Sequence, residues 1–568
     1  MLETRTVTAG EALVQMLRRH DVEIVFGLCG DTSLPWYDAL RSSAALRHVL
    51  TRDERHAAYM ADAYSRISGR VGVCEGPSGG GATYILPGVV EANESSIPVL
   101  AITTDIGVAS RGHFVLTELD QRALFAPLTK WNASIDAAAE LPRLVREAFL
   151  EMTTGRPGAA HLALPFDVQR EEVRMPPPSG ESAFGSYPSR RVEPDGTTLT
   201  AAAKLLAQAE RPIAICGGGV VISGAQAELA ALAERLGFPV ATTISGKGSI
   251  AETHPLAAGV VGSNGGVPET RRLVDEADLV VFIGCRAGSV TTERWRHPAR
   301  GSSKVVHIDV DPRAIGANYP TDAAIIGDAK LALGALCSEL EGVRVRTNRD
   351  EAVARVARAK EEKFARFRSL AEDDRAPIRP EKLVQELERA LASRARDAIV
   401  AADPGTPCPY LSAYFVQTTA SRTFITNRAH GALGYSLAAA CGAQFAAPER
   451  KIVAVMGDGS FAMTCGELET IVRCHLPITL VVVSNSEFGW IKAGQKHGFG
   501  SRFFSVDFSR TDHARIAEAF GLRAWRVEDP RALSGALDEA VRHDGPSLVD
   551  VVAQPLEESR APVSEWIA

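Results

Sequence analysis

Short apolar runs alternate with amphipathic stretches along almost the whole chain. The segment GEALVQMLRRHDV has apolar residues at helical spacing, and it is followed by EIVFGLCGD, an apolar run that ends in a glycine turn. Continuous apolar strands separated by helices are typical of parallel sheets that are covered by helices on both faces. The pattern therefore predicts an α/β protein with doubly wound parallel sheets. The other runs of this kind are PVLAITTD, AAHLALP, RPIAICGGG, FPVATTI, ADLVVFIG, KVVHIDVD, DAIVAAD, KIVAVMGDG, PITLVVVSN and SLVDVVAQP.

Two segments interrupt this alternation and divide the chain. Residues 175–196 are rich in proline, glycine and serine, which indicates a linker, and residues 344–382 are charged and predict a helical connector. The three blocks that remain have the size of ordinary domains. We expect three doubly wound domains and a short C-terminal tail, with boundaries at 1–175, 195–343, 380–556 and 557–568.

Composition and charge narrow the range of partners. The 568 residues are 45% hydrophobic and carry a formal net charge of -7, which gives no reason to expect nucleic acid or an anionic membrane as a partner. We see no apolar run long enough to span a membrane, and the N-terminus lacks the pattern of a signal peptide. The nine cysteines show neither a CxxC pair nor a zinc spacing. We therefore expect reduced thiols in a cytoplasmic protein.

The ends of two apolar runs carry the strongest candidate chemistry. KIVAVMGDG ends at Gly457, Asp458 and Gly459, and PITLVVVSN ends at Asn485. If the two strands are neighbours, the carboxylate and the amide oxygen meet at the carboxyl edge of the sheet, and such oxygens suit Mg²⁺. The glycines let the backbone approach a phosphate, and Ser460 could bond to that phosphate or cap the following helix. The residues therefore predict a Mg²⁺–diphosphate site.

The stretch from Val453 to Trp490 also resembles the cofactor signature of thiamine diphosphate (ThDP) enzymes. In that signature Gly-Asp-Gly is followed, after about 25 residues, by two asparagines. Ser484 stands in place of the first asparagine, but Asn485 matches the second, which is the metal ligand. The resemblance implies ThDP and Mg²⁺ as cofactors, with the backbone carbonyl of Glu487 as a further metal ligand.

Two other segments resemble the parts of these enzymes that hold the aminopyrimidine ring. Residues 50–105 resemble the first domain, where a glutamate bonds to a ring nitrogen and so promotes loss of the thiazolium proton. Glu54 takes that position, and we expect it to be partly buried with a raised pKa. In HGALGYSLAAACGAQFA, Leu433 matches the residue that keeps the coenzyme bent, and the Gly431 carbonyl matches an acceptor for the ring.

The resemblance covers essentially the whole chain, in the order pyrimidine-binding, central and diphosphate-binding domain. Gly405 and Thr406 open the third block and are placed to contact phosphate. In the central block, CGGGVV does not fit a dinucleotide fingerprint, and the flavin pattern is not evident, so flavin is not predicted; nucleotide binding in this block stays open. Because the family glutamate comes from a partner subunit, the resemblance implies a homodimer or homotetramer with interfacial sites.

The segments around the expected substrate pocket do not single out one reaction. FGLCGDTSLPWYDAL resembles the acid–base loop of decarboxylases, which makes Asp31 a candidate. SRGHFVLTELDQ lacks the paired histidines of pyruvate decarboxylases and offers only His113, while Thr117 stands where acetolactate synthases carry glutamine. The side chain of Glu487 could hold a substrate hydroxyl, relay a proton, or simply face solvent.

We predict a ThDP- and Mg²⁺-dependent carboligase that decarboxylates a 2-keto acid such as pyruvate and transfers the acyl group to a carbonyl acceptor. It is most similar to acetolactate synthase. The alternatives are a 2-hydroxyacyl-CoA lyase or oxalyl-CoA decarboxylase, for which the C-terminal segment is short, and an NAD-dependent dehydrogenase. A coenzyme-binding protein without turnover is less consistent with the presence of Glu54. The sequence does not identify the acceptor.

Overall fold

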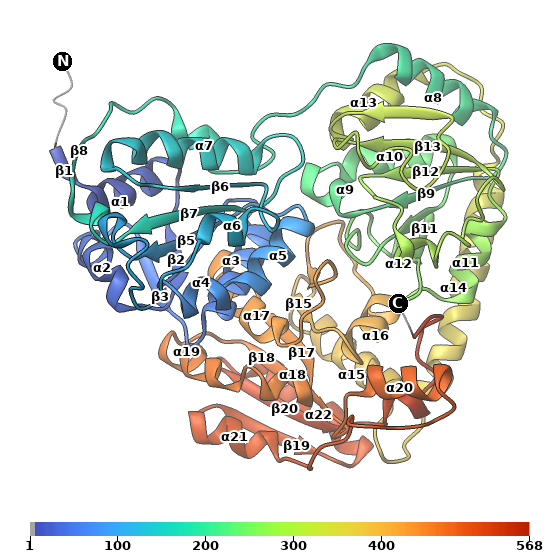
Figure 1. Cartoon of the computed structure of the whole chain (residues 1–568). Helices are drawn as coiled ribbons and strands as arrows, with labels where there is room; N and C mark the ends of the chain where they lie inside the picture. Colours follow the sequence, from blue (N-terminus) through green and yellow to red (C-terminus); the bar gives the residue numbers. More distant parts are fainter. Residues whose placement is uncertain (1–5, 567–568) are drawn as a thin grey trace. The chain divides into compact units, whose positions relative to one another are not determined.

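Three six-stranded parallel sheets, each flanked by helices, form the framework of the protein (Figure 1). The structure is a computed structural model that describes residues 6–566. It confirms the predicted fold class. A separate antiparallel pair joins β1 (Thr6–Thr8) to β8 (Glu172–Arg174).

The first sheet has the strand order β3-β2-β4-β5-β7-β6. Helices α1, α2 and α7 bury Leu17, Trp36 and Phe149 against one face of this sheet. The strands are β2 (Ile24–Gly27), β3 (Arg47–Leu50), β4 (Gly72–Gly76), β5 (Val99–Asp105), β6 (Trp131–Ser134) and β7 (Ala160–Pro165), and the helices are α1 (Ala9–Arg19), α2 (Leu34–Arg41), α3 (Glu54–Ser68), α4 (Gly80–Tyr84), α5 (Leu86–Glu94), α6 (Gln121–Phe125) and α7 (Leu141–Thr153).

The second sheet shows why its strands read as unbroken apolar runs. Ala214 and Cys216 of β9 pack with α8, α10 and α13, whereas Ile213 and Ile215 pack with α11 and α14 on the opposite face. Its order is β11-β10-β9-β12-β13-β14. The elements are β9 (Pro212–Cys216), β10 (Val240–Thr242), β11 (Ala257–Val260), β12 (Leu279–Ile283), β13 (Lys304–Asp309), β14 (Ala323–Ile326), α8 (Gly196–Gln208), α9 (Gly218–Ser223), α10 (Gln226–Leu236), α11 (Pro268–Asp275), α12 (Ser289–Thr292), α13 (Ala329–Glu339) and α14 (Arg349–Ala371).

The third sheet has the order β16-β15-β17-β18-β20-β19 and carries α15 and α22 on one face, where Leu387 and Leu537 join its core. Its elements are β15 (Ile399–Ala402), β16 (Phe424–Thr426), β17 (Ile452–Gly457), β18 (Thr479–Ser484), β19 (Arg523–Val527), β20 (Ser547–Val552), α15 (Pro380–Ala392), α16 (Pro407–Tyr414), α18 (Asp458–Ala462), α20 (Gly489–Gly498), α21 (His513–Phe520) and α22 (Leu533–Arg542).

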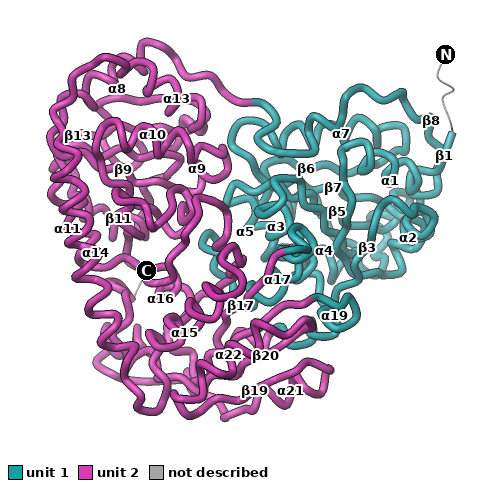
Figure 2. Tube along the Cα trace, turned by 180° about the vertical axis from the view of Figure 1, so that it is seen from behind, with its two compact units in different colours: residues 1–190, 427–449, 464–476 teal, residues 191–426, 450–463, 477–568 magenta. Residues whose placement is uncertain are grey.

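Two compact units divide the chain differently from its order in sequence (Figure 2). Unit 1 contains residues 6–190 together with 427–449 and 464–476, and unit 2 contains the rest of the described chain. The added pieces of unit 1 carry α17 (Tyr435–Ala446) and α19 (Leu468–Arg473). Helix α17 packs tightly on α3, because a Cβ at Gly442 would lie only 2.1 Å from the carbonyl oxygen of Met60.

The segments between the sheets agree in part with expectation. Helix α14 confirms the predicted helical connector. The predicted linker holds one short 3-10 turn, Glu181–Phe184, before α8 begins at Gly196. Tail residue Ser564 donates its N–H to the carbonyl of Ser263 at 3.0 Å. Within residues 6–566 the longest helices are too polar or too short to cross a membrane. The exact domain boundaries stay a prediction.

Candidate active site

Asp458 lies where the strongest sequence pattern placed it, directly after β17. Strand β17 pairs in parallel with β18, with Gly457 opposite Val483, so the condition that these two strands are neighbours is met. One carboxylate oxygen of Asp458 accepts the backbone N–H groups of Asn485 at 3.0 Å and Ser486 at 2.6 Å. The two strand ends therefore meet at a single carboxylate.

This carboxylate is almost completely buried. Asp458 is 2% exposed, and burial raises its pKa, while hydrogen bonds from backbone N–H groups, including that of Gly459 at 2.9 Å, act in the opposite direction. The suggestion that Ser460 caps the next helix is wrong: Asp458 already begins α18, and Gly457 occupies the capping position. A Cβ at Gly457 would meet no atom within 4 Å, so the space beside this turn is open.

The neighbouring strand contributes the other two predicted phosphate contacts. Gly405 and Thr406 follow β15, which pairs in parallel with β17, so they share the carboxyl edge with Asp458. Gly405 has a φ of +95°, a conformation that favours glycine, and Thr406 is buried at the start of α16. The structure thus gathers these residues, Asp458 and Asn485 along one sheet edge in unit 2.

Glu487 begins a charged cluster rather than a solvent-facing helix. It is 5% exposed, and its carboxylate accepts the Lys492 ammonium at 2.7 Å. Lys492 also pairs with Asp507 at 2.8 Å and Glu557 at 3.3 Å. Burial raises the pKa of Glu487 to about 7, and the nearby Glu557 carboxyl adds to this. Sequence reasoning missed Lys492 and Glu557, because nothing in the local pattern links the tail to this turn.

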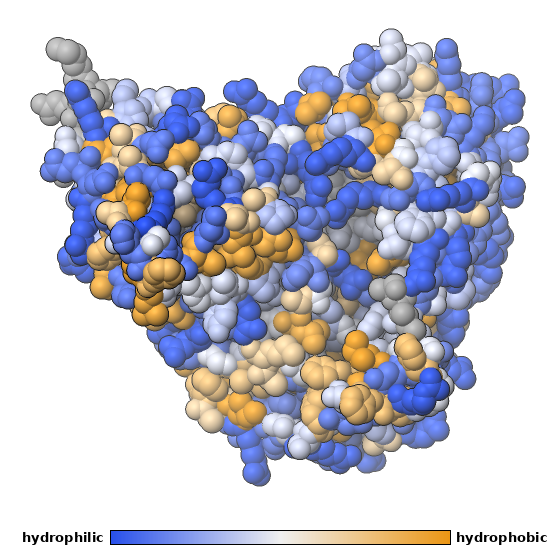
Figure 3. Space-filling view, viewed as in Figure 1, coloured by the Kyte–Doolittle hydropathy of each residue, from blue (hydrophilic) through white to orange (hydrophobic). Residues whose placement is uncertain are grey.

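Exposed apolar side chains lie on helix α20 and mainly on the segment that follows it. Apolar side chains gather over α20 and the segment that follows it on the face shown in Figure 3. Trp490 packs its ring against Trp566 with centroids 5.1 Å apart. The large exposed hydrophobic residues here are Ile491, Phe499, Phe503, Phe504 and Phe508.

In unit 1, Glu54 meets the expectation of a buried acid with a raised pKa. It is the first residue of α3 and only 7% exposed, and burial raises its pKa. Two glycines leave room beside it: a Cβ at Gly76 would lie 3.3 Å from Cγ of Glu54, and a Cβ at Gly81 would lie 3.2 Å from Oε1. The acid is therefore withdrawn from water yet has small neighbours, which suits a group that must contact a ligand.

Gly431 and Leu433 lie on the segment that leads into α17, also in unit 1. Gly431 is exposed with a φ of +73°, and Leu433 is half-buried. Asn427 closes this segment on itself by donating its side-chain amide to the carbonyl of Ala432 at 2.5 Å. The segment is thus a loop closed by an internal hydrogen bond, with Gly431 at its surface.

Asp31 and His113 are both exposed on loops of unit 1. Asp31 starts a 3-10 turn and accepts the N–H of Thr32 at 2.8 Å. Within residues 6–566, neither side chain is hydrogen-bonded to Glu54. Their assignment as acid–base groups stays a prediction.

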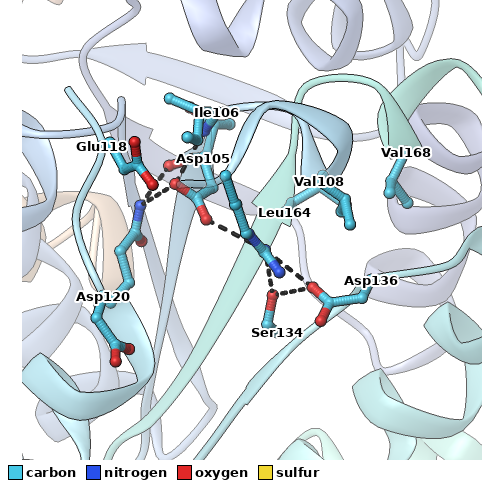
Figure 4. A network of polar contacts seen from close by, with 12 residues as sticks. Asp105, Ile106, Val108, Glu118, Asp120, Ser134, Asp136, Leu164 and Val168 are labelled. Carbon is cyan, nitrogen blue, oxygen red and sulfur yellow. Dashed lines mark hydrogen bonds and ion pairs between the residues drawn. The ribbon is translucent and has the colours of Figure 1, made fainter. Parts of the chain in front are cut away.

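The loop that carries His113 is anchored at one carboxylate, that of Asp105 at the end of β5 (Figure 4). Arg111 donates to Asp105 at 3.3 Å and pairs with Asp136 at 2.9 Å. Gln121, beyond the loop, donates to Asp105 at 3.3 Å. Both ends of the loop are therefore tied to the same strand end.

A chain of hydroxyl groups lies next to this loop and was not predicted. Thr117 contacts Ser78 at 2.7 Å between hydroxyl oxygens, Ser78 contacts Thr32 at 3.1 Å, and Thr32 contacts Thr104 at 2.8 Å. Only Thr117 was singled out from the sequence. The others sit in loops and strand ends whose convergence has no local signature.

The donor sets fit the cofactors that the sequence implied. A carboxylate, an amide oxygen and a backbone carbonyl form a suitable partial shell for Mg²⁺ and leave positions for phosphate oxygens. Among residues 6–566, no group of three or more His, Cys, Asp and Glu side chains is placed to hold a metal ion. The open space at Gly457 and the small residues beside Glu54 are consistent with a coenzyme of this kind.

Comparison with protein families covers all three blocks. Residues 7–124 match the N-terminal TPP binding domain of thiamine pyrophosphate enzymes, residues 199–336 match their central domain, and residues 403–551 match their C-terminal TPP binding domain. The glycine run of the central block therefore lies in a thiamine pyrophosphate enzyme domain.

Similar proteins span the chain almost from end to end. A probable acetolactate synthase large subunit of Methanococcus aeolicus is 36% identical over 560 residues, which cover 97% of this chain and 92% of that protein. A probable acetolactate synthase large subunit of Methanocaldococcus jannaschii is 36% identical over 554 residues, covering 96% and 92%. An acetolactate synthase of Arthrospira platensis is 33% identical over 564 residues, covering 96% and 94%.

Proposed function

Because this chain belongs to the acetolactate synthase-like thiamine pyrophosphate enzymes, we propose that it decarboxylates a 2-keto acid such as pyruvate and transfers the acyl group to a carbonyl acceptor. The observation that carries the proposal is the buried Asp458 at the meeting point of two strand ends, held by the backbone N–H of Asn485. Bound ThDP would supply a thiazolium carbon that adds to the keto group and a positively charged ring that accepts the electron pair left when carbon dioxide departs.

The residues of unit 2 would hold the diphosphate end. Asp458, the side-chain oxygen of Asn485 and the carbonyl of Glu487 would hold Mg²⁺, whose charge would offset that of the diphosphate. Gly405, Thr406 and the turn from Gly457 to Ser460 would contact the phosphates, since this edge combines open space with backbone N–H groups.

The residues of unit 1 would hold the ring end. Glu54 would keep a proton at a ring nitrogen, and the burial that raises its pKa favours this protonated form. The carbonyl of Gly431 would accept the ring amine, and Leu433 would support the coenzyme from below. Asp31, His113 or the side chain of Glu487 would move the substrate proton.

We further propose that two copies of the chain complete each site and that the protein is cytoplasmic. Phe114 is 99% exposed and Leu116 is 84% exposed on the anchored loop, and such apolar residues favour an interface. Within residues 6–566 the cysteines form no disulfide bond, which agrees with a reducing compartment.

Calorimetric titration with ThDP tests the proposed cofactor chemistry. We expect saturable binding with Mg²⁺ present and its loss when a chelator removes the metal. ThDP binding with the same affinity in the presence of the chelator would refute the metal site. Incubating the loaded protein with formyl-CoA and a simple ketone tests the acyl-CoA alternative, because a new CoA thioester in the mass spectrum would favour that branch over a keto-acid carboligase.

A further inference from the structure

A buried carboxylate in unit 1 holds the loop that carries Gly431. Glu91 of α5 is fully buried, and one of its oxygens accepts two consecutive backbone N–H groups, those of Ala429 at 3.1 Å and His430 at 2.7 Å. Carboxylate bonds to backbone N–H groups are charge-assisted and short. The carboxylate thus binds the backbone directly before Gly431, the predicted contact of the coenzyme ring.

The same carboxylate is part of a longer buried network. Its other oxygen accepts Arg66 at 3.1 Å and the hydroxyl of Ser95 at 2.6 Å. Arg66 donates to Asp62 at 2.8 Å, and the hydroxyl of Tyr435 donates to the same Asp62 oxygen at 2.6 Å. Burial alone would lower the pKa of Arg66, but Asp62, Tyr435 and Glu91 together raise it by more. The pKa therefore lies above its usual value, and the guanidinium keeps its charge.

This network reaches both ends of the loop. Glu91 holds its beginning at Ala429 and His430, and Asp62 holds its end at Tyr435, the first residue of α17. Between these points Gly431 and Gly434 have φ values of +73° and +85°. Because glycine allows many backbone conformations, the two glycines would let this loop adopt several shapes if its ends were not held.

We propose that the Glu91–Arg66–Asp62–Tyr435 network is a clamp that fixes the Gly431–Leu433 segment in the shape that receives the coenzyme ring. The four side chains are positioning residues. The inference rests on the proposed function for the role of Gly431 and Leu433. Its energetic basis is preorganisation: a loop that is already ordered does not lose this conformational entropy when the ligand binds.

Two variants and two matched controls test the clamp. Glu91→Gln removes the charge at the start of the loop, and Tyr435→Phe removes one hydroxyl at its end. Glu181→Gln is the control for the first, because Glu181 is also a buried carboxylate of unit 1 that accepts a backbone N–H, from Ser179 at 2.7 Å. Tyr319→Phe is the control for the second, since its buried hydroxyl donates to the carbonyl of Pro298 at 3.0 Å, in the central block.

The first measurement is hydrogen–deuterium exchange of the full-length protein without coenzyme. In Glu91→Gln, we expect the amides of Ala429 and His430 to exchange about tenfold faster, because their acceptor is weakened. In Tyr435→Phe the whole 427–435 peptide should exchange faster, by about threefold. The controls should leave this peptide unchanged. Should the loss of charge beside Arg66 prevent Glu91→Gln from folding, Tyr435→Phe carries the test.

The second measurement is the affinity for ThDP with saturating Mg²⁺. We expect Kd to rise about tenfold in Glu91→Gln and about threefold in Tyr435→Phe, with kcat at saturating coenzyme unchanged. Exchange rates and affinities equal to those of the matched controls would overturn the clamp. Failure of the unmodified protein to bind ThDP at all would instead refute the proposed function, on which the role of this loop depends.

Discussion

Asp458, at the end of β17, accepts the backbone N–H of Asn485, at the end of the neighbouring strand β18, at 3.0 Å. The bond explains why two short polar residues interrupt two buried apolar runs. It orients the Asp458 carboxylate and fixes the backbone from which the Asn485 side chain extends. The carboxyl edge of the sheet thereby gains a carboxylate beside an amide, which is the chemistry that a metal-bound diphosphate needs.

Asp458→Asn should abolish metal-dependent coenzyme binding. The substitution keeps the size of the side chain but removes the charge that would neutralise Mg²⁺, so we expect ThDP affinity to fall by about a hundredfold or more. Calorimetry at saturating Mg²⁺ checks this. Asp309→Asn is the matched control, because Asp309 also ends a parallel strand, β13, outside the proposed site; if both variants bound ThDP equally well, Asp458 would have no role in the metal site.

Glu54→Gln should separate coenzyme activation from coenzyme binding. Glutamine retains the shape of the buried side chain but cannot give a proton, so we expect kcat to fall by about a hundredfold to a thousandfold, with Kd for ThDP changed by less than about threefold. NMR measurement of the exchange rate of the thiazolium proton in the loaded protein reports the step directly. An unchanged exchange rate would remove Glu54 from this role.

Glu388 should make the stability of unit 2 depend on pH. Burial raises its pKa to about 7 from 4.5, although its carboxylate accepts the N–H of Val416 at 2.6 Å. Because the folded chain holds this proton more tightly, the stabilising contribution is complete below about pH 4.5 and is lost as the pH rises through 7. At about 1.4 kcal/mol per pKa unit, a rise from 4.5 to about 7 corresponds to a loss of at most about 3.5 kcal/mol.

Urea denaturation at several pH values between 4.5 and 8 measures this effect. Glu388→Gln should flatten this part of the pH dependence. Glu386→Gln, two residues earlier on the same helix, should not. A steep dependence that survives in Glu388→Gln would assign it to other groups.

Gly72 should be intolerant of any side chain. A Cβ at this position of β4 would lie 2.1 Å from the carbonyl oxygen of Ala61 in α3, so Gly72→Ala should destabilise the fold by about 3 kcal/mol. Gly334 in α13 has no atom within 4 Å of the same position, and Gly334→Ala should stabilise by about 0.5–1 kcal/mol. Denaturation midpoints that move in the same direction would contradict this contrast.

The fold was predictable wherever a strand is buried on both faces. Every interior strand except β4 had been recognised as an apolar run. The exception is instructive, since β4 is wholly buried but contains two glycines and Glu75. Gly72 leaves room for the close approach of α3, and the buried Glu75 accepts hydrogen bonds from Tyr37 and His48. Tertiary packing therefore removed the apolar pattern.

The edge strands β6 and β19 escaped prediction because they are partly exposed. Strand β6 is only half-buried along its length, and β19 begins at an exposed arginine, so neither requires an apolar run. The edge of a parallel sheet is defined by its neighbours more than by its own side chains.

The site was predictable where one motif contains both partners. Asp458 and Asn485 lie in one strand–helix–strand pattern, so their meeting follows from parallel pairing. Glu91 and His430 are 339 residues apart, and nothing near either residue announces their contact. The same holds for Glu557 and Lys492, which the return of the tail brings together.

The most direct test of the central claim is the amount of carbon dioxide released per pyruvate consumed by the protein loaded with ThDP and Mg²⁺. When pyruvate alone is supplied, it is both the donor and the carbonyl acceptor, so carboligation joins two pyruvate molecules and releases one carbon dioxide. We therefore expect one carbon dioxide for every two pyruvates, with acetolactate as the product seen by NMR. Pyruvate left unconsumed, or one carbon dioxide per pyruvate with no new carbon–carbon bond, would contradict the account.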